Sequence, residues 1–242
     1  MKKQRDYQIT EELLIKYQNA ALENAQELVD EASLLYSEKH YARSYFLALA
    51  SIEEVGKSHI SFSTRGRNLK DTGMCNKIRE HFECHDKKIV NAFVPWMMKA
   101  SLKREAIEVA NQLMLDLKYG REKAMYIDVK SDQTLSIPKQ IVRPVAAKDC
   151  IRIATNCINY AKYYYQNNKP YKYSSYDDKL MSINTKQLTT MMNNIDFWEY
   201  YLDCLKTDKS SDAFNKSMVK YYDGYYKKKI KYKSIKTEEA AV

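Results

Sequence analysis

The segment Ser44-Tyr-Phe-Leu-Ala-Leu-Ala-Ser-Ile-Glu-Glu-Val-Gly-Lys57 begins as an apolar helical sequence and then carries two adjacent carboxylates and a lysine. Its predicted buried face consists of small and apolar residues at helical spacing, namely Ala48, Ser51, Ile52 and Val55. Glu53, Glu54 and Lys57 lie beside Gly56, whose missing side chain allows another backbone to approach closely. This pattern fits a solvated helix end, and it also fits a functional site between helices.

The composition favours helices. The chain has 242 residues, which suits one domain with an appendage and is enough for a substantial core. Hydrophobic residues make up 45% and charged residues 29%, as is usual for a soluble globular protein. Only 5 Gly and 4 Pro occur, and this scarcity of turn formers favours long helices over a strand-rich sandwich or barrel. We therefore predict an all-α helical bundle.

Helical periodicity predicts five long helices in residues 1–166, which we expect to form one domain. They run from Glu11 to about Ser37, from Tyr41 to Ser61, from Cys75 to Pro95, from Leu102 to Tyr119, and onward from Pro144. We expect Thr10 to cap the first helix, Pro95 to end or kink the third, and Gly120 to cap the fourth. Residues 124–129 and 134–138 look extended and predict one short hairpin.

Residues 167–242 are rich in Tyr and Lys and are predicted to form a helical C-terminal extension with a basic tail. Two further helices are expected there, at Leu188 to Leu205 and at Ala213 to Tyr226. The formal net charge of the chain is +9. Part of the excess lies in the tail, at Lys227, Lys228, Lys229, Lys231 and Lys233, interleaved with Tyr225, Tyr226 and Tyr232.

Such a tail suits RNA, because lysines contact phosphates and aromatic rings stack on bases. An AT-rich genome would also enrich Lys and Tyr without any functional reason, and the chain contains 21 Tyr in all.

The five cysteines are odd in number and form no CxxC pair, which predicts free thiols in a reducing cytoplasm. We expect no signal peptide, no membrane association and no cofactor.

The segment Arg79-Glu-His-Phe-Glu-Cys-His-Asp-Lys-Lys88 is a second polar cluster within a helical pattern. Arg79 and His85 have the chemistry of metal-free RNA cleavage, since an imidazole moves protons and a guanidinium stabilises phosphate charge. On one ideal helix these two side chains would point about 120° apart. Their cooperation therefore requires a helix start, a kink or a second subunit.

Other interpretations of these residues remain open. His81 and His85 are four residues apart, which is the spacing of paired metal ligands on a helix, but the remaining ligands are not evident and we predict no metal. A structural ion-pair network is the other alternative, and it would join Glu53, Glu54, Lys57, His85 and Lys88. On either the catalytic or the network interpretation, six residues should converge between the helices that carry them, namely Glu53, Glu54, Lys57, Arg79, His85 and Lys88.

At these residues the chain resembles the AbiV family of bacterial abortive-infection proteins, which belongs to the HEPN-type helical bundles. The matching elements are Phe46–Lys57, His85-Asp-Lys-Lys88, and Arg121-Glu-Lys-Ala-Met-Tyr-Ile-Asp-Val129 with Pro138 downstream. Their order and spacing are those of the family over roughly residues 10 to 165. Residues beyond 166 have no recognised counterpart.

The resemblance implies phage defence in the cytoplasm, through arrest of growth or translation upon infection. HEPN relatives are often dimeric ribonucleases in which an arginine and a histidine, four to six residues apart, meet across the dimer. Residue by residue, this motif falls on Arg79 and His85, so a homodimer is expected. The residue after the arginine is often Asn, Asp or His in active relatives, whereas here it is Glu80, whose carboxylate would repel a phosphate.

Two classes of function follow from the resemblance. The first is a metal-independent endoribonuclease that acts on host or phage RNA. The second is a non-catalytic defence protein that binds a phage protein or the translation machinery. The sequence identifies neither the infection trigger nor the target, and it assigns no role to the C-terminal third.

Overall fold

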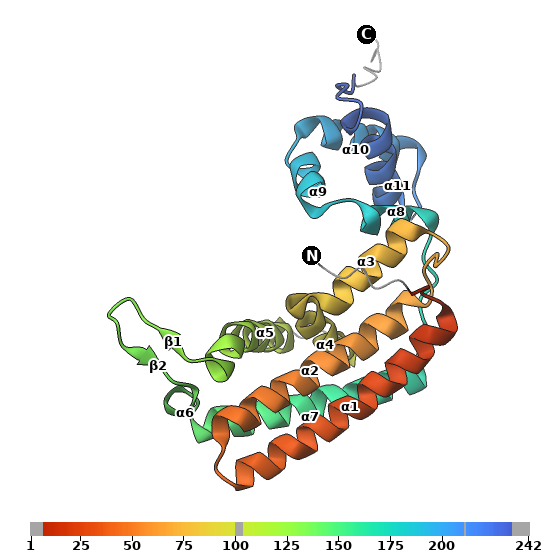
Figure 1. The fold of residues 1–242 in the computed structure, drawn as a ribbon. Helices are drawn as coiled ribbons and strands as arrows, with labels where there is room; N and C mark the ends of the chain where they lie inside the picture. Colours follow the sequence, from red (N-terminus) through yellow and green to blue (C-terminus); the bar gives the residue numbers. More distant parts are fainter. Residues whose placement is uncertain (1–6, 100–103, 211, 234–242) are drawn as a thin grey trace, which may run out of the picture. The chain divides into compact units, whose positions relative to one another are not determined.

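The computed structural model describes residues 7–99, 104–210 and 212–233. The all-α prediction is confirmed: within these residues, strands occur only as β1 (Asp128–Val129) and β2 (Leu135–Ser136), which form an antiparallel hairpin (Figure 1). The chain divides into an N-terminal unit, residues 1–69 with 78–171, and a C-terminal unit, residues 70–77 with 172–242. This division lies a few residues after the predicted boundary at 166.

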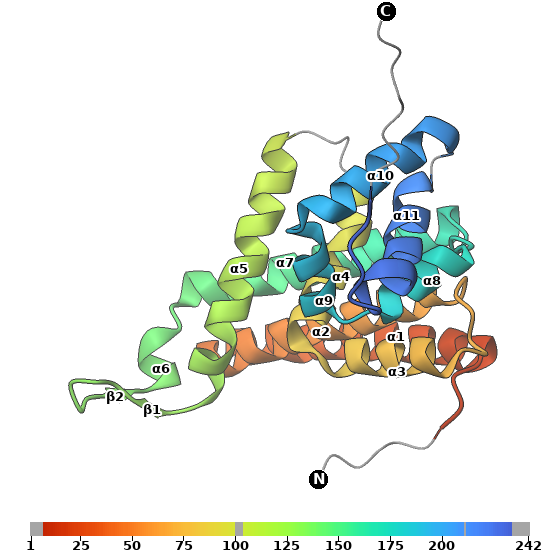
Figure 2. The same cartoon turned by 90° about the horizontal axis from the view of Figure 1, so that it is seen from above.

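Five helices surround the core of the N-terminal unit. They are α1 (Glu11–Ser37), α2 (Tyr41–Thr64), α4 (His85–Lys99), α5 (Arg104–Met125) and α7 (Pro144–Asn167). Figures 1 and 2 show α1, α2 and α7 running alongside one another, and α5 leading into the hairpin. As predicted, Thr10 caps α1, since its hydroxyl accepts a hydrogen bond from the backbone N–H of Leu13 at 3.1 Å.

Serines on one stripe of α2 fasten it to α1. The Oγ atoms of Ser44, Ser51 and Ser58, seven residues apart, donate to the carbonyl oxygens of Ala32, Ala25 and Gln18 at 2.8, 2.6 and 2.9 Å. The acceptors on α1 are also spaced by seven residues and run in the opposite direction. These small side chains allow the two helices to pack closely, and each buried hydroxyl is satisfied by the opposite backbone.

Several predicted helix boundaries are wrong. The helix expected from Cys75 to Pro95 is two helices, α3 (Thr72–Glu83) and α4, which are separated at Cys84, and α4 continues past Pro95 to Lys99. No glycine or proline marks the break, so no local turn signal could have predicted it. Instead, the break makes His85 the first residue of a new helix.

The helix predicted to end at Tyr119 continues through Gly120 to Met125, while its predicted start at Leu102 lies outside the described residues. Gly120 is not in a left-handed conformation. It lies instead against Tyr45, whose hydroxyl would be 2.5 Å from a Cβ at that position. The glycine therefore permits close side-chain packing and does not end the helix.

After the hairpin, the short helix α6 (Pro138–Ile141) leads into α7. As predicted, α7 directs Cys150, Ile153, Ala154, Cys157, Ile158 and Ala161 into the core. The C-terminal unit contains α8 (Ser175–Ser182), α9 (Thr185–Met192), α10 (Ile195–Thr207), α11 (Ala213–Tyr221) and the π-helix η1 (Tyr222–Tyr226). The helix predicted from Leu188 to Leu205 is therefore interrupted, because Asn194 caps a new helix by accepting from the N–H of Asp196.

One core histidine should make the stability of the fold depend on pH. His59 is buried on α2 among the rings of Phe62, Tyr164 and Tyr165, and burial lowers its pKa to about 4. The unfolded chain binds this proton near pH 6.5, so His59 should lower the stability by up to about 3 kcal/mol between pH 6.5 and 4. Its contribution should not change further below pH 4.

Urea unfolding at pH 7 and at pH 4.5 measures this loss. In a His59→Phe protein the difference between the two pH values should be smaller, because the buried imidazole is gone. His40→Phe, which changes an exposed histidine, is the matched control. Equal pH dependence in the wild type and the His59→Phe protein would contradict the assignment.

Candidate functional site

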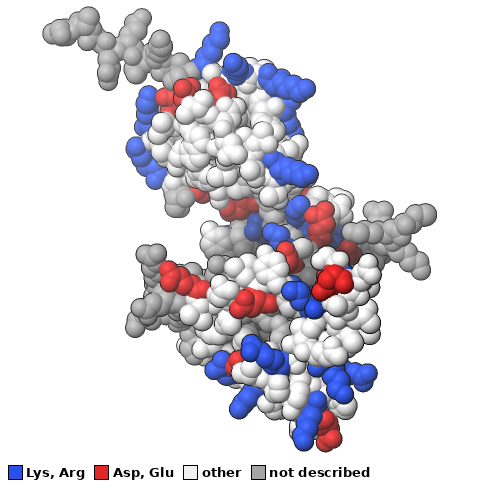
Figure 3. All heavy atoms as spheres, turned by 90° about the vertical axis from the view of Figure 1, so that its left-hand side faces the viewer, with Lys and Arg blue, Asp and Glu red and all other residues white. Residues whose placement is uncertain are grey.

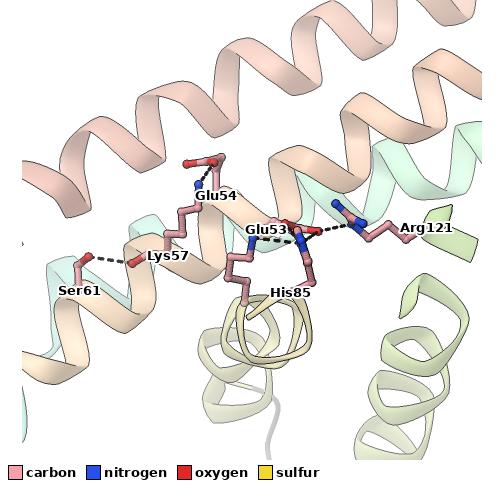
Figure 4. A network of polar contacts seen from close by, with 7 residues as sticks. Glu53, Glu54, Lys57, Ser61, His85 and Arg121 are labelled. Carbon is pink, nitrogen blue, oxygen red and sulfur yellow. Dashed lines mark hydrogen bonds and ion pairs between the residues drawn. The ribbon is translucent and has the colours of Figure 1, made fainter. Parts of the chain in front are cut away.

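The carboxylate of Glu53 is the centre of a charged cluster inside the N-terminal unit. Glu53 is only 7% exposed and lies on α2, facing α4 and α5 (Figure 4). Its Oε2 accepts from Lys88 Nζ at 2.6 Å, and its Oε1 accepts from Arg121 Nε at 2.9 Å. His85 Nδ1 lies 2.8 Å from Oε2 and 2.9 Å from Oε1. One buried carboxylate thus joins two cations and an imidazole from two other helices.

Gly56 makes this arrangement possible. A Cβ at this position would lie 1.9 Å from the carbonyl oxygen of Lys88, which is backbone and cannot move aside. The absent side chain lets α4 approach α2 closely enough for Lys88, itself 5% exposed, to reach Glu53. The close approach expected at this glycine is therefore made by the backbone of α4.

The contacts of His85 define its orientation. A carboxylate cannot donate a hydrogen bond, so Nδ1 carries the proton that faces Glu53 in the neutral ring. Lys88 Nζ lies 3.1 Å from the same nitrogen, but its shorter contact is with the carboxylate. Within the described residues nothing bonds to Nε2, and the His85 side chain is 47% exposed. In the neutral ring, Nε2 is then the unprotonated nitrogen, and it belongs to a side chain that is about half exposed.

The family model for AbiV matches residues 13–159, which is more than half of the chain. The chain belongs to the AbiV family. The match includes all four residues of the Glu53 cluster, and membership places the protein among the abortive-infection proteins of bacterial phage defence. No curated protein and no solved structure matches the chain significantly.

The partners of Glu53 in the Glu53 cluster keep its carboxylate ionised. Burial by itself would raise the pKa of this carboxyl, but hydrogen bonds from Lys88 and His85 outweigh burial and hold the pKa below its ordinary value. With His85 neutral, one carboxylate faces two cations, and the cluster retains a positive charge. Such a site favours an anion next to the imidazole.

Three of the six residues expected to converge do so: Glu53, His85 and Lys88. Glu54 and Lys57 form a separate ion pair at 2.5 Å, and Figure 4 shows them on another side of α2. Burial alone would lower the pKa of Lys57, but its bond to Glu54 raises it. The adjacent carboxylates of the Glu53-Glu54 pair thus have different partners because successive helical residues point about 100° apart.

Arg79 and His81 lie on α3. The Arg79 guanidinium donates to the carbonyl oxygen of Tyr7 and lies over the Tyr7 ring, 5.1 Å from its centroid. His81 is half-buried. Because the helix breaks at Cys84, Arg79 and His85 belong to different helices, and the 120° separation expected on one helix does not apply to them.

Arg121 is the member of the cluster that side-chain chemistry alone did not reveal. It lies 68 residues from Glu53 along the chain, and in the sequence its segment stands out only through the family resemblance. No local pattern distinguishes it from the other basic residues of its helix. Only the packing of α5 against α2 identifies it.

Two of the aromatic rings predicted to stack on RNA bases in the C-terminal tail are packed against other side chains. Tyr225 and Tyr232 pack on Tyr200 and on each other, while the Tyr232 hydroxyl donates to Asp203 at 2.8 Å. Lys227 pairs with Asp223 at 3.2 Å. The other lysines predicted to bind RNA are exposed, namely Lys228, Lys229, Lys231 and Lys233. Binding of RNA by this tail stays a prediction, and it would rest on these lysines more than on the packed rings.

Within the described residues, no group of three or more His, Cys, Asp and Glu side chains is arranged to hold a metal ion. In the same part of the chain, no helix combines the length and the apolar character needed to cross a membrane.

Proposed function

We propose that this AbiV-family protein is a metal-independent endoribonuclease in which His85 transfers the proton that starts RNA cleavage. The observation that carries the proposal is the orientation of His85, whose Nδ1 faces Glu53 and whose Nε2 is open to solvent. A carboxylate behind an imidazole sets its tautomer and stabilises the imidazolium that forms, as a general base requires.

In the proposed reaction, a ribose 2′-hydroxyl attacks the adjacent phosphorus while Nε2 of His85 accepts its proton. The bond from phosphorus to O5′ breaks, and O5′ takes a proton from the imidazolium or from water. The products are a 2′,3′-cyclic phosphate and a 5′-hydroxyl end. Lys88 and Arg121 place positive charge beside the imidazole, where the phosphorane gains negative charge.

Arg79 keeps its proposed role as a phosphate ligand, for which its guanidinium would exchange the Tyr7 carbonyl for a phosphate oxygen. We also retain the proposed homodimer, because a two-fold axis would bring Arg79 of one subunit to the partner subunit's His85. Light scattering at micromolar concentration should then give twice the mass of one chain.

The second candidate is a non-catalytic defence protein that binds a phage protein or the translation machinery. The contacts of Glu53 favour this second candidate, because both of its carboxylate oxygens already have cationic partners. The cluster is therefore complete as a structural network. On this alternative, His85 contributes to helix packing and its Nε2 has no chemical task.

Incubation of purified protein with RNA in the presence of EDTA distinguishes the two candidates. The wild type should produce fragments with cyclic phosphate ends, and His85→Ala should reduce the rate about 100-fold or more because the proton acceptor is gone. Cys84→Ala changes the exposed neighbouring residue and should retain activity. Equal rates in the wild type and the His85→Ala protein would overturn the catalytic proposal.

A further inference from the structure

Two open cavities adjoin each other where α5 meets the hairpin. The first, of about 960 Å³, is lined by residues of α5 and the hairpin, including Lys118, Lys123 and Lys130. The second, of about 600 Å³, lies where α6 meets the start of α2 and is lined by Lys39, Arg43 and Lys139 among others. Ile127 lines both. The two cavities therefore adjoin at this residue, and together we call them the hairpin surface.

The hairpin surface is strongly basic. Its described lining contains six Lys and Arg side chains and two carboxylates, Glu122 and Asp128, and both carboxylates belong to the larger cavity. Within the described residues, Lys118 alone of the six cations has an ion-pair partner, Asp86 at 3.6 Å. Figure 3 views the molecule from the hairpin side, and Lys and Arg side chains gather at the lower end of the N-terminal unit.

The surface also presents aromatic rings. Tyr119 and Tyr126 line the larger cavity and are 73% and 59% exposed. Exposed rings beside unpaired lysines match the two needs of a single-stranded nucleic acid, which are stacking for its bases and cations for its phosphates. An acidic peptide would use the lysines but would not need the rings.

One ion pair joins the lining of the larger cavity to the first turn of α4, which carries His85. Lys118, which lines the larger cavity, contacts Asp86, the residue that follows His85. An extended strand bound along the lysines could therefore continue to the imidazole.

We propose that the hairpin surface binds single-stranded RNA and delivers it to His85. This inference rests on the proposed function for its link to cleavage, but RNA binding can be tested without cleavage. The cations of this surface come from two regions of the chain, residues 39–43 and 118–139, and they are spaced apart within the second, so no single basic run in the chain identifies the surface.

The test measures fluorescence anisotropy of a labelled single-stranded RNA in the His85→Ala background, where the RNA stays intact. Lys123→Glu/Lys139→Glu changes one cation in each cavity and should raise the Kd at least tenfold. The slope of log affinity against log salt should fall by about 0.7 for each phosphate that the variant no longer neutralises. Tyr126→Ala should weaken binding about fivefold or more, because one base can no longer stack on its ring.

The matched control is Lys179→Glu/Lys186→Glu, which makes the same change in charge at exposed lysines of the C-terminal unit and should alter the Kd less than twofold. Equal losses in the two double variants would overturn the proposal. The proposal would also be overturned if polyglutamate displaced the labelled RNA as effectively as unlabelled RNA does, since the surface would then recognise acidic protein.

The two proposals can fail separately. If the wild type does not cleave RNA but Lys123→Glu/Lys139→Glu still weakens binding selectively, the catalytic proposal fails and the hairpin surface stands. If the wild type cleaves RNA and the same variant binds RNA normally, only the proposal that the hairpin surface binds RNA fails.

Discussion

Glu53→Ala should destabilise the N-terminal unit by about 3–5 kcal/mol, because it leaves Lys88 buried without a counter-charge. Lys88 is 5% exposed and its ammonium has the carboxylate as its close partner at 2.6 Å, so water cannot easily replace the carboxylate. Arg121 loses the same partner, but its side chain is 21% exposed and can be solvated more readily. Denaturant unfolding at pH 7 measures the change in stability.

Glu54→Ala is the matched control for this experiment, since it removes the same side chain from the next residue of the same helix. Glu54 pairs with Lys57, and both side chains retain partial contact with solvent. The expected loss is therefore about 1 kcal/mol or less. Glu53→Ala/Lys88→Met should recover part of the stability by removing the unpaired charge as well. Similar losses for Glu53→Ala and Glu54→Ala would show that Glu53 is not the centre of the cluster.

Gly56→Ala should cost more than about 3 kcal/mol, which is above the usual cost of overpacking. The added methyl would meet the carbonyl oxygen of Lys88 at 1.9 Å, so α2 and α4 must separate. Separation would also draw Lys88 and His85 away from Glu53, and RNA cleavage should be lost together with stability. Thermal unfolding and the cleavage assay report the two effects.

Gly120→Ala is the control within the same unit. Its methyl would meet the hydroxyl of Tyr45, the far end of a side chain, at 2.5 Å. A side chain can shift where a helix backbone cannot, and alanine itself favours the helix by about 1 kcal/mol over glycine. The net loss should therefore be smaller than for Gly56→Ala. A Gly56→Ala protein as stable as the wild type would contradict the close approach of α4.

Much of the fold follows from local patterns. Periodicity predicted the buried stripe of α7, and Thr10 marked the start of α1. The break at Cys84 could not be predicted, because it coincides with tertiary contacts that bring His85 and Lys88 to Glu53, without any turn residue. The prediction that Gly120 ends a helix was wrong because a glycine that ends a helix and one that admits a neighbouring side chain look alike in sequence.

The candidate site was predictable only in part. In the sequence, Gly56 close to the charged Glu53 indicated a close contact between helices. The segment 85–88 contains two partners of Glu53, His85 and Lys88. The separate pairing of Glu54 with Lys57 depends on which helix each face meets, which one helix alone does not reveal. Arg121 joins the cluster across 68 residues of sequence, and the Tyr7 contact of Arg79 is equally nonlocal.

On the proposed mechanism, His85 carries out the chemistry by which this AbiV-family protein protects a host. Phage plating on cells that express the wild type or the His85→Ala protein tests it most directly, once circular dichroism and expression levels show that both are folded and equally abundant. The wild type should lower phage yield while infected cells stop growing, and His85→Ala should restore phage yield to that of unprotected cells. Full protection by a folded His85→Ala protein would show that protection does not depend on catalysis by His85.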